Sequence, residues 1–348
     1  MITYLPFEEP LVQLKDKITE MKAQSAGQSA VTEMIAVMEE KYNEIEKHTY
    51  ANLSPWDTVL VSRHPKRPQT RDYIALALDK FEELHGDRMF RDDLAIVTGL
   101  AQIGEHRIML IGQHKGRDVN ERHHCHAGCP HPEGYRKAQR KMELANRLGI
   151  PIVTLVDTKG AYPGIGSEQR GQGPALAEAI QCMAGLRVPV VCVVIGEGGS
   201  GGALAVGVGN KILMMQHAYY SVISPEGCAS ILWRDGSRKA DAAKVLKLTG
   251  RDLLAHGFID EIIEEPLGGA HRDPQIAAQF VRSAIINALD SLKGFSPDEL
   301  REQRYQKFRA FGKLAEGMTI ESVLEQWDKP AQTEQIQETQ QTDHQENT

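Results

Sequence analysis

The residues of this chain best suited to chemistry are five glycines within the seven positions from Gly196 to Gly202. An apolar run from Val190 to Ile195 precedes them, and a helical pattern at residues 203–208 follows. Glycine lets the backbone approach a ligand closely, and the first amides of a helix are donors without partners at the positive end of its dipole. The segment therefore predicts a site for negative charge. The alternative is that the glycines only permit tight packing of a strand against a helix.

Two nucleotide-binding patterns overlap this segment and fit it poorly. Gly196, Gly198 and Gly201 have the spacing of the dinucleotide fingerprint, but no acidic residue ends a strand about 20 residues later, where residues 214–217 read Met-Met-Gln-His. A Walker A loop is excluded because no Lys-Ser or Lys-Thr pair follows the glycines.

Two catalytic interpretations of the segment stay open. Gly198, Ser200 and Gly202 match the nucleophile elbow of serine hydrolases, and Asp260 and His271 follow in a permitted order. In the other interpretation, backbone amides alone form an oxyanion hole and Ser200 is merely a small residue.

A second strand followed by a glycine-rich turn, residues 157–166, is expected to form another wall of the site. Tyr162 in this turn can stack on or orient a planar ligand, or it can be a buried tyrosine with a satisfied hydroxyl. Both interpretations stay open.

Residues 123–131 hold four histidines and two cysteines, which are ligands for a soft metal ion. The two cysteines have the spacing Cys-x-x-x-Cys, and no second distant pair accompanies them. This is a weak zinc signature, so we expect no bound metal.

The charge balance argues against nucleic acid or an anionic membrane as a partner. There are 40 Lys and Arg against 47 Asp and Glu, a net charge of -7. Two basic patches, residues 63–67 and residues 136–141, could meet an anion, although solvated surface charge is the favoured interpretation of each. No apolar run approaches the length of a membrane span. Five cysteines in a long chain argue for a reducing compartment and hence a cytoplasmic protein.

The elements that must position these residues follow from hydrophobic patterning. Apolar runs of strand length at residues 108–111, 152–156 and 190–195 alternate with helical patterns at 174–183 and 203–208. Strands buried on both faces and alternating with helices are typical of an α/β layer fold. Helices are also expected at about 70–84, at 274–292 and from 296 to about 311.

The termini differ from this central part. Leu11, Leu14, Ile18 and Met21, and then Val31, Met34, Met38, Tyr42 and Ile45, recur at helical spacing and predict a hairpin. Ser54-Pro55 reads as the start of a helix. We expect a helical hairpin over 1–50, a central domain over 51–295, C-terminal helices over 296–328 and a disordered tail over 329–348.

Longer motifs resemble the α-subunit family of the bacterial or plastid acetyl-CoA carboxylase carboxyltransferase. They are residues 112–117, 133–138, 160–164, 194–207, 221–233 and 265–271, and the resemblance extends from the N-terminal hairpin to about Gly312. It implies an α/β fold of the crotonase type, a superhelix of β-β-α units. It also implies transfer of a carboxyl group from biotin, carried on a separate carrier protein, to acetyl-CoA, giving malonyl-CoA for fatty acid synthesis.

The resemblance also implies partners and site residues. The partners are a carboxyltransferase β subunit in an α2β2 assembly, the biotin carboxyl carrier protein and a biotin carboxylase. The amides of Gly201 and Gly202 are expected to face the ureido oxygen of biotin. The residues expected to bind substrate are Gly198, Gly199, Tyr162, Pro163, Gly164, Ile165, Lys115, Gly116 and Arg117.

Two segments depart from the family pattern. Lys159 stands where family members usually have proline, so the turn that follows is expected to be looser. Residues 123–131 replace a basic and apolar stretch. Besides a serine hydrolase, an inactive scaffold of the same fold is therefore an alternative. A plastid stromal location is the counterpart of the cytoplasm if the source is eukaryotic.

Overall fold

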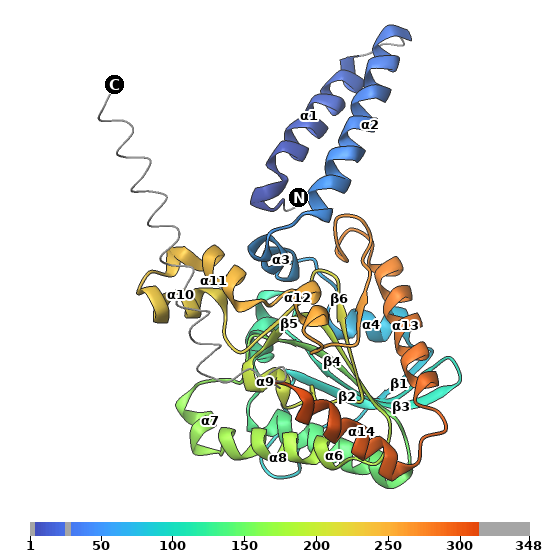
Figure 1. Ribbon diagram of the computed structural model, residues 1–348, viewed down its shortest axis with the longest axis vertical. Coiled ribbons are helices and arrows are strands. Elements are labelled where there is room, and N and C mark those ends of the chain that lie inside the picture. Colours follow the sequence, from blue (N-terminus) through green and yellow to red (C-terminus); the bar gives the residue numbers. More distant parts are fainter. Residues whose placement is uncertain (1–3, 25–28, 313–348) are drawn as a thin grey trace, which may run out of the picture. The chain divides into compact units, whose positions relative to one another are not determined.

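The computed structural model describes residues 4–24 and 29–312 of the chain (Figure 1). The chain divides into two units, residues 1–306 and residues 307–348. The expected tail over 329–348 and the helices expected beyond residue 312 lie outside the described residues. The domain boundaries at 50, 295 and 328 stay predictions.

A single eight-stranded sheet forms the centre of the described part of the chain, in the order β1-β2-β3-β4-β5-β6-β8, with β7 paired to β5. The strands are β1 (Lys80–Glu83), β2 (Ile96–Ile103), β3 (His106–Gln113), β4 (Ile152–Thr158), β5 (Val190–Gly199), β6 (Lys211–Met215), β7 (Tyr219–Ser221) and β8 (Glu261–Ile263). The pairs β1–β2 and β2–β3 are antiparallel, and the pairs from β3 onward are parallel. All residues of β4 and β5 are buried, as expected for parallel strands covered on both faces.

Helices cover both faces of this sheet (Figure 1). Helices α4 (Thr70–Ala77) and α13 (Pro274–Ser291) pack together on one face of the sheet. Residues of both helices line a small cavity together with Leu110 and Val153 of the sheet. Helices α6 (Pro132–Leu148) and α8 (Gln172–Gly185) lie on the other side of the strands. The other helices are α3 (Pro55–Ser62), α5 (Val119–His124), α7 (Ile165–Gln169), α9 (Ser200–Leu204), α10 (Pro225–Trp233), α11 (Lys239–Leu246), α12 (Gly250–Ala255) and α14 (Pro297–Ala310).

Most expected elements are confirmed, including the cap that starts α3. The Ser54 hydroxyl accepts a hydrogen bond from the Asp57 amide at 3.1 Å, and Pro55 occupies the first helical position. The prediction of one helix over 70–84 is wrong in its second half. Helix α4 ends at Ala77, and β1 pairs with β2 along the edge of the sheet. Strand β1 is short and has a single apolar residue, Phe81. Its sequence therefore lacks the alternation of apolar and polar residues by which a strand is recognised.

The glycine-rich segment is also arranged differently from the prediction. Residues 196–199 are not a loop but the end of β5, and the helix that follows begins at Ser200 and ends at Leu204. The pattern at 203–208 is therefore not the helix. A helix this short has little macrodipole. Of the two features that predicted a site for negative charge, only the backbone amides of the first turn therefore remain.

The N-terminal periodicity corresponds to two helices, α1 (Glu9–Gln24) and α2 (Ser29–Ala51), which pack against each other. Leu11 and Ile18 of α1 are buried, as the stripe predicts. In α2 the buried residues include Ile35 and Tyr50, whereas Met34 is 57% exposed. No helix in the described ranges is long and apolar enough to cross a membrane.

Candidate active site

A cleft of about 740 Å³ opens beside the carboxyl ends of β4 and β5. Its volume is within the range of small-molecule sites. The residues that line it are Arg63, Lys159, Gly160, Ala161, Leu176, Ser200, Gly201, Gly202, Tyr219, Val222, Ile223, Ser224 and Glu226. Both strand-ending segments that the sequence singled out therefore contribute to the same cleft.

The start of α9 presents backbone to this cleft. A Cβ added to Gly201 would meet no atom within 4 Å, so Gly201 faces open space. A Cβ added to Gly202 would stand 2.5 Å from the Ala161 nitrogen and 2.6 Å from the Gly160 carbonyl carbon. Glycine is required at 202 because the turn after β4 presses against it.

Hydrogen bonds to the carbonyl oxygens of Gly201 and Gly202 fix the backbone of α9 in place. Gly201 O accepts from Ala205 N at 2.9 Å, and Gly202 O accepts from Gln113 Nε2 at 2.8 Å. The Gln113 Oε1 atom also accepts from Asp157 N at 3.1 Å, so this one side chain joins β3, β4 and α9. The N–H groups of the first helical turn have no partner within the helix. They are fixed donors at the edge of the cleft.

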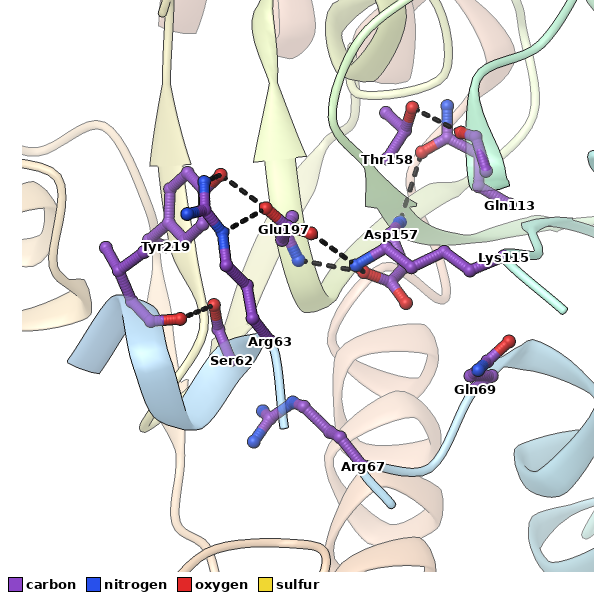
Figure 2. A network of polar contacts seen from close by, with 12 residues as sticks. Ser62, Arg63, Arg67, Gln69, Gln113, Lys115, Asp157, Thr158, Glu197 and Tyr219 are labelled. Carbon is purple, nitrogen blue, oxygen red and sulfur yellow. Dashed lines mark hydrogen bonds and ion pairs between the residues drawn. The ribbon is translucent and has the colours of Figure 1, made fainter. Parts of the chain in front are cut away.

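A buried charge network lies next to the cleft (Figure 2). Glu197 of β5 forms ion pairs with Lys115 Nζ at 2.8 Å and with Arg63 Nε at 2.7 Å, and it accepts from the Tyr219 hydroxyl at 2.7 Å. Lys115 Nζ is also 2.6 Å from Asp157 Oδ1. Burial disfavours the charged form of Glu197, but Lys115 and Arg63 outweigh it and lower the pKa of this carboxyl to about 2. Glu197 is therefore ionised at neutral pH.

Arg63 connects this network to the cleft. Besides Glu197 it binds Glu226 Oε1 at 2.6 Å, and its guanidinium carbon lies 5.6 Å from the centre of the Tyr219 ring. Burial acts against the cation, yet Glu197 dominates and raises the pKa of Arg63 above its ordinary value. Arg63 thus holds three elements, α3, β5 and α10, around one side of the cleft.

The structure separates the predicted site residues into two groups. Gly201 and Gly202 line the cleft, whereas Gly198 and Gly199 do not. A Cβ on Gly198 would stand 2.8 Å from the Tyr220 ring, and one on Gly199 would stand 2.2 Å from the Lys159 carbonyl oxygen. For these two positions packing is a sufficient reason for glycine.

The motif at 115–117 contributes structure beside the cleft. Lys115 belongs to the charge network. Gly116 has φ +83°, and its missing Cβ leaves room for the backbone of α5, with Arg122 N 2.5 Å away. Arg117 pairs with Asp72 on the surface.

The segment from Tyr162 to Ile165 does not line the cleft either. The Tyr162 ring packs on the rings of His131 and His126, with centroids 4.4 Å and 5.2 Å away. Pro163 is exposed, Ile165 is 79% exposed, and Gly164 leaves room for the Tyr162 ring. Of this second wall, Lys159, Gly160 and Ala161 reach the cleft.

The residues of the hydrolase alternative are not assembled. Ser200 lines the cleft, but neither Asp260 nor His271 does. His271 stacks on His64 with centroids 3.8 Å apart, and Asp260 Oδ2 accepts from Ile212 N at 2.7 Å. Burial, and then the neighbouring His64, lower the pKa of His271 to about 3, which makes it a poor general base at neutral pH. The positive φ of Ser200, +54°, is the one feature shared with a nucleophile elbow.

The basic patches are mostly internal, which corrects the favoured interpretation of solvated charge. Arg67 is 4% exposed and pairs with Glu265 at 2.6 Å, and Lys137 is 1% exposed and pairs with Asp92 at 2.6 Å. In the cysteine and histidine stretch, the described residues form no group of three or more possible metal ligands.

Residues 4–312 match the protein family described as acetyl co-enzyme A carboxylase carboxyltransferase-like. The acetyl-coenzyme A carboxylase carboxyl transferase subunit alpha of Burkholderia cenocepacia (strain HI2424) is 50% identical over 315 residues, which is 90% of this chain and 98% of that protein. The protein of the same description from Burkholderia vietnamiensis (strain G4 / LMG 22486) gives the same values. The chain belongs to this family. The carboxyltransferase α-subunit assignment drawn from the motifs is thereby confirmed, and the hydrolase alternative is wrong.

Two solved structures share the fold of this carboxyltransferase subunit. The transcarboxylase 12S structure has a TM-score of 0.53 at 20% identity, covering 66% of this chain and 44% of that one. The MdcD-MdcE hetero-dimer of Pseudomonas malonate decarboxylase has a TM-score of 0.52 at 17% identity, covering 62% of this chain and 88% of that one. The expected crotonase-type α/β fold is confirmed.

Several residues of the site were not identified from the sequence. Gln113, Asp157, Glu197, Arg63 and Tyr219 come from four strands and a helix end. Asp157 and Glu197 each stand at the end of a buried strand, and this position is the signal by which they could have been found. No pattern in the sequence around Arg63 indicates that its side chain pairs with Glu197, which is 134 positions away.

Proposed function

We propose that this carboxyltransferase subunit provides the biotin side of the transfer of a carboxyl group from carboxybiotin, carried on a separate protein, to acetyl-CoA. Carboxybiotin supplies an activated carboxyl group when it is bound. Transfer leaves negative charge on the ureido oxygen of the ring. The chain's task in this proposal is to bind the ring, orient it and stabilise that charge.

The observation that carries the proposal is that Gly201 and Gly202, in the first turn of α9, both line the cleft. Amide donors fixed before the reaction stabilise a developing oxyanion without reorganising, and removing one such donor typically costs about 100- to 1000-fold in rate. The fit to a flat, uncharged ring is supported by the absence of any atom within 4 Å of a Gly201 Cβ. A bulky side chain there would occupy the space that the ring needs.

The charge network supports orientation rather than proton transfer. Glu197 is ionised and bound on all sides by Lys115, Arg63 and Tyr219. A carboxylate with a pKa of about 2 is a weak base. In this proposal the network fixes the end of β5, from which α9 begins.

The remaining half of the reaction is assigned to partners. Deprotonating the acetyl group of acetyl-CoA produces a second oxyanion, on the thioester, and we assign its stabilisation to a β subunit in an α2β2 complex. The carrier protein and biotin carboxylase complete the assembly, and ATP is used only in the biotin carboxylase reaction. The cytoplasm, or a plastid stroma, is the expected location.

Reconstitution tests this proposal. The full chain, mixed with the β subunit, carboxylated carrier protein and acetyl-CoA, should form malonyl-CoA, whereas the chain alone should form none. Product from the chain alone would contradict the division of the site between subunits. Absence of product from the complete mixture, with the complex intact, would support the inactive scaffold instead.

A further inference from the structure

We propose that residues 125–131, named here the histidine loop, clamp the turn of residues 158–162 against the start of α9 and so position the oxyanion donors. The inference rests on the proposed function, because it gives the loop a part in that site. It assigns a positioning role, with no metal, to a segment whose composition suggested metal binding.

Two hydrogen bonds join the histidine loop to the turn, and a third holds the turn itself. The Thr158 hydroxyl lies 2.5 Å from Gly128 O, to which it donates, and it accepts from Gly160 N at 3.0 Å. Tyr162 N donates to Pro130 O at 3.0 Å. Thr158 is fully buried, so the loss of its hydroxyl would leave two backbone groups without a partner or with a poorer one.

A bridging side chain from α8 reinforces the same junction. Gln172 Nε2 donates to Pro130 O at 2.8 Å and lies 3.1 Å from Tyr162 O. One amide therefore touches a carbonyl of the loop and a carbonyl of the turn. Pro130 and Tyr162 are distant in sequence but share this one side chain as an anchor.

The rings of the loop pack on the turn as well. His126 and His131 are 4.1 Å apart, and both contact the Tyr162 ring. The His131 ring also hydrogen-bonds Ser167, so its orientation is fixed. These contacts pack the Tyr162 ring against the histidine loop.

The backbone of the histidine loop is held in an unfavourable conformation. His126, Ala127 and Gly128 have φ values of +49°, +50° and +82°. Consecutive residues in the left-handed region are costly and persist only where surrounding contacts enforce them. At Gly128 a Cβ would stand 2.5 Å from Lys115 Cγ, so the loop also packs on the charge network.

Displacement of the turn would reach the donors directly. Gly160 and Ala161 lie against Gly202, and the Lys159 carbonyl lies against Gly199, at distances that leave no room for a side chain. Backbone packed on backbone has little freedom to absorb a shift. A loosened turn therefore loosens the start of α9.

The test is Thr158→Val, which is nearly isosteric and removes the hydroxyl, with Thr158→Ser as the matched control that keeps it. In the full chain, amide hydrogen exchange of peptides covering 158–162 and 200–204 should be roughly tenfold faster in the Val variant and unchanged in the Ser variant. Peptides from β2 should not change. Faster exchange at 158–162 without any change at 200–204 would overturn the proposal.

Kinetics of the reconstituted complex provide the second readout. Thr158→Val should lower kcat by roughly tenfold to a hundredfold, because catalysis is sensitive to small misplacements, while the KM for acetyl-CoA stays unchanged. His131→Leu, which removes a ring from the same clamp, should lower kcat as well, and the double variant should be no slower than the slower single variant. Fully additive losses, or wild-type kcat in Thr158→Val, would contradict a shared clamp. If the wild-type complex forms no product, the proposed function fails, and the exchange measurement still decides the clamp.

Discussion

At the residue scale, two neighbouring glycines have different reasons to be glycine. Gly201 borders open space, whereas Gly202 is in contact with the backbone of residues 160–161. A sequence pattern cannot separate these reasons, since both positions read as small residues in a glycine-rich segment. The distinction decides which substitution probes folding and which probes the cleft.

Gly202→Ala should therefore destabilise the chain, by about 1 to 3 kcal/mol, because its Cβ would overlap the Ala161 nitrogen and no flexible side chain can move away. Urea unfolding of the full chain measures this. Gly201→Ala is the control and should leave stability unchanged or slightly raised. Equal stability of the two variants would show that the turn after β4 does not press on α9.

Glu197 contacts Lys115, Arg63 and Tyr219 of the charge network. Glu197→Gln should destabilise the chain by about 3 kcal/mol at neutral pH, since it leaves Arg63 and Lys115 with one fewer carboxylate in a buried setting. Glu226→Gln removes the other partner of Arg63. It should cost less than about 1 kcal/mol, because that carboxylate is 40% exposed.

The pH dependence of this difference follows from the direction of the pKa shift. The pKa of Glu197 in the folded chain, about 2, is below its ordinary value of 4.5, so its stabilisation is complete above pH 4.5 and is lost as the pH falls toward 2. The stability gap between wild type and Glu197→Gln should stay constant from pH 5 to 8 and shrink below about pH 4.5. A gap that grows in acid would contradict the ion pairs.

At the element scale, the sequence predicts the parallel strands well and the antiparallel edge poorly. Buried runs such as 152–156 and 190–195 can be recognised because both faces are apolar. Strand β1 has no such signal, and its pairing with β2 is a tertiary effect. The end of β5 was misjudged for a related reason. Glycines that usually indicate a loop are used there to let Tyr220 and the Lys159 carbonyl approach the strand.

The N-terminal hairpin gives an element-scale prediction. Ile35→Asp should separate α2 from α1 at a cost of about 3 kcal/mol or more, because it places a carboxylate at a buried position. Met34→Asp, one residue earlier on the exposed side, should have little effect. Amide exchange over residues 31–50 of the full chain distinguishes the two. A larger increase in exchange for Met34→Asp than for Ile35→Asp would contradict this. It would indicate that Met34 is the buried position, as the helical spacing in the sequence predicted.

At the scale of the whole molecule, the proposed oxyanion donors of the described residues lie in a single cleft, the one that Gly201 and Gly202 line, while the proposed reaction develops negative charge on two oxygens. The net charge of -7 does not prevent this, because the cations that matter are held locally, at Arg63 and Lys115, beside the carboxylates that fix them. The sequence could predict the cleft's strand ends. It could not predict the network, whose members are brought together only by the sheet order.

The most direct test of the account is the effect of Gly201→Ala on the reconstituted complex. A methyl group at this position enters the space proposed for the biotin ring without touching the fold. The account predicts at least a tenfold lower kcat for malonyl-CoA formation, with an unchanged melting temperature and an unchanged KM for acetyl-CoA. Ser200→Ala, its neighbour, should keep most of the activity. Wild-type kcat in Gly201→Ala, together with an inactive Ser200→Ala, would contradict the account.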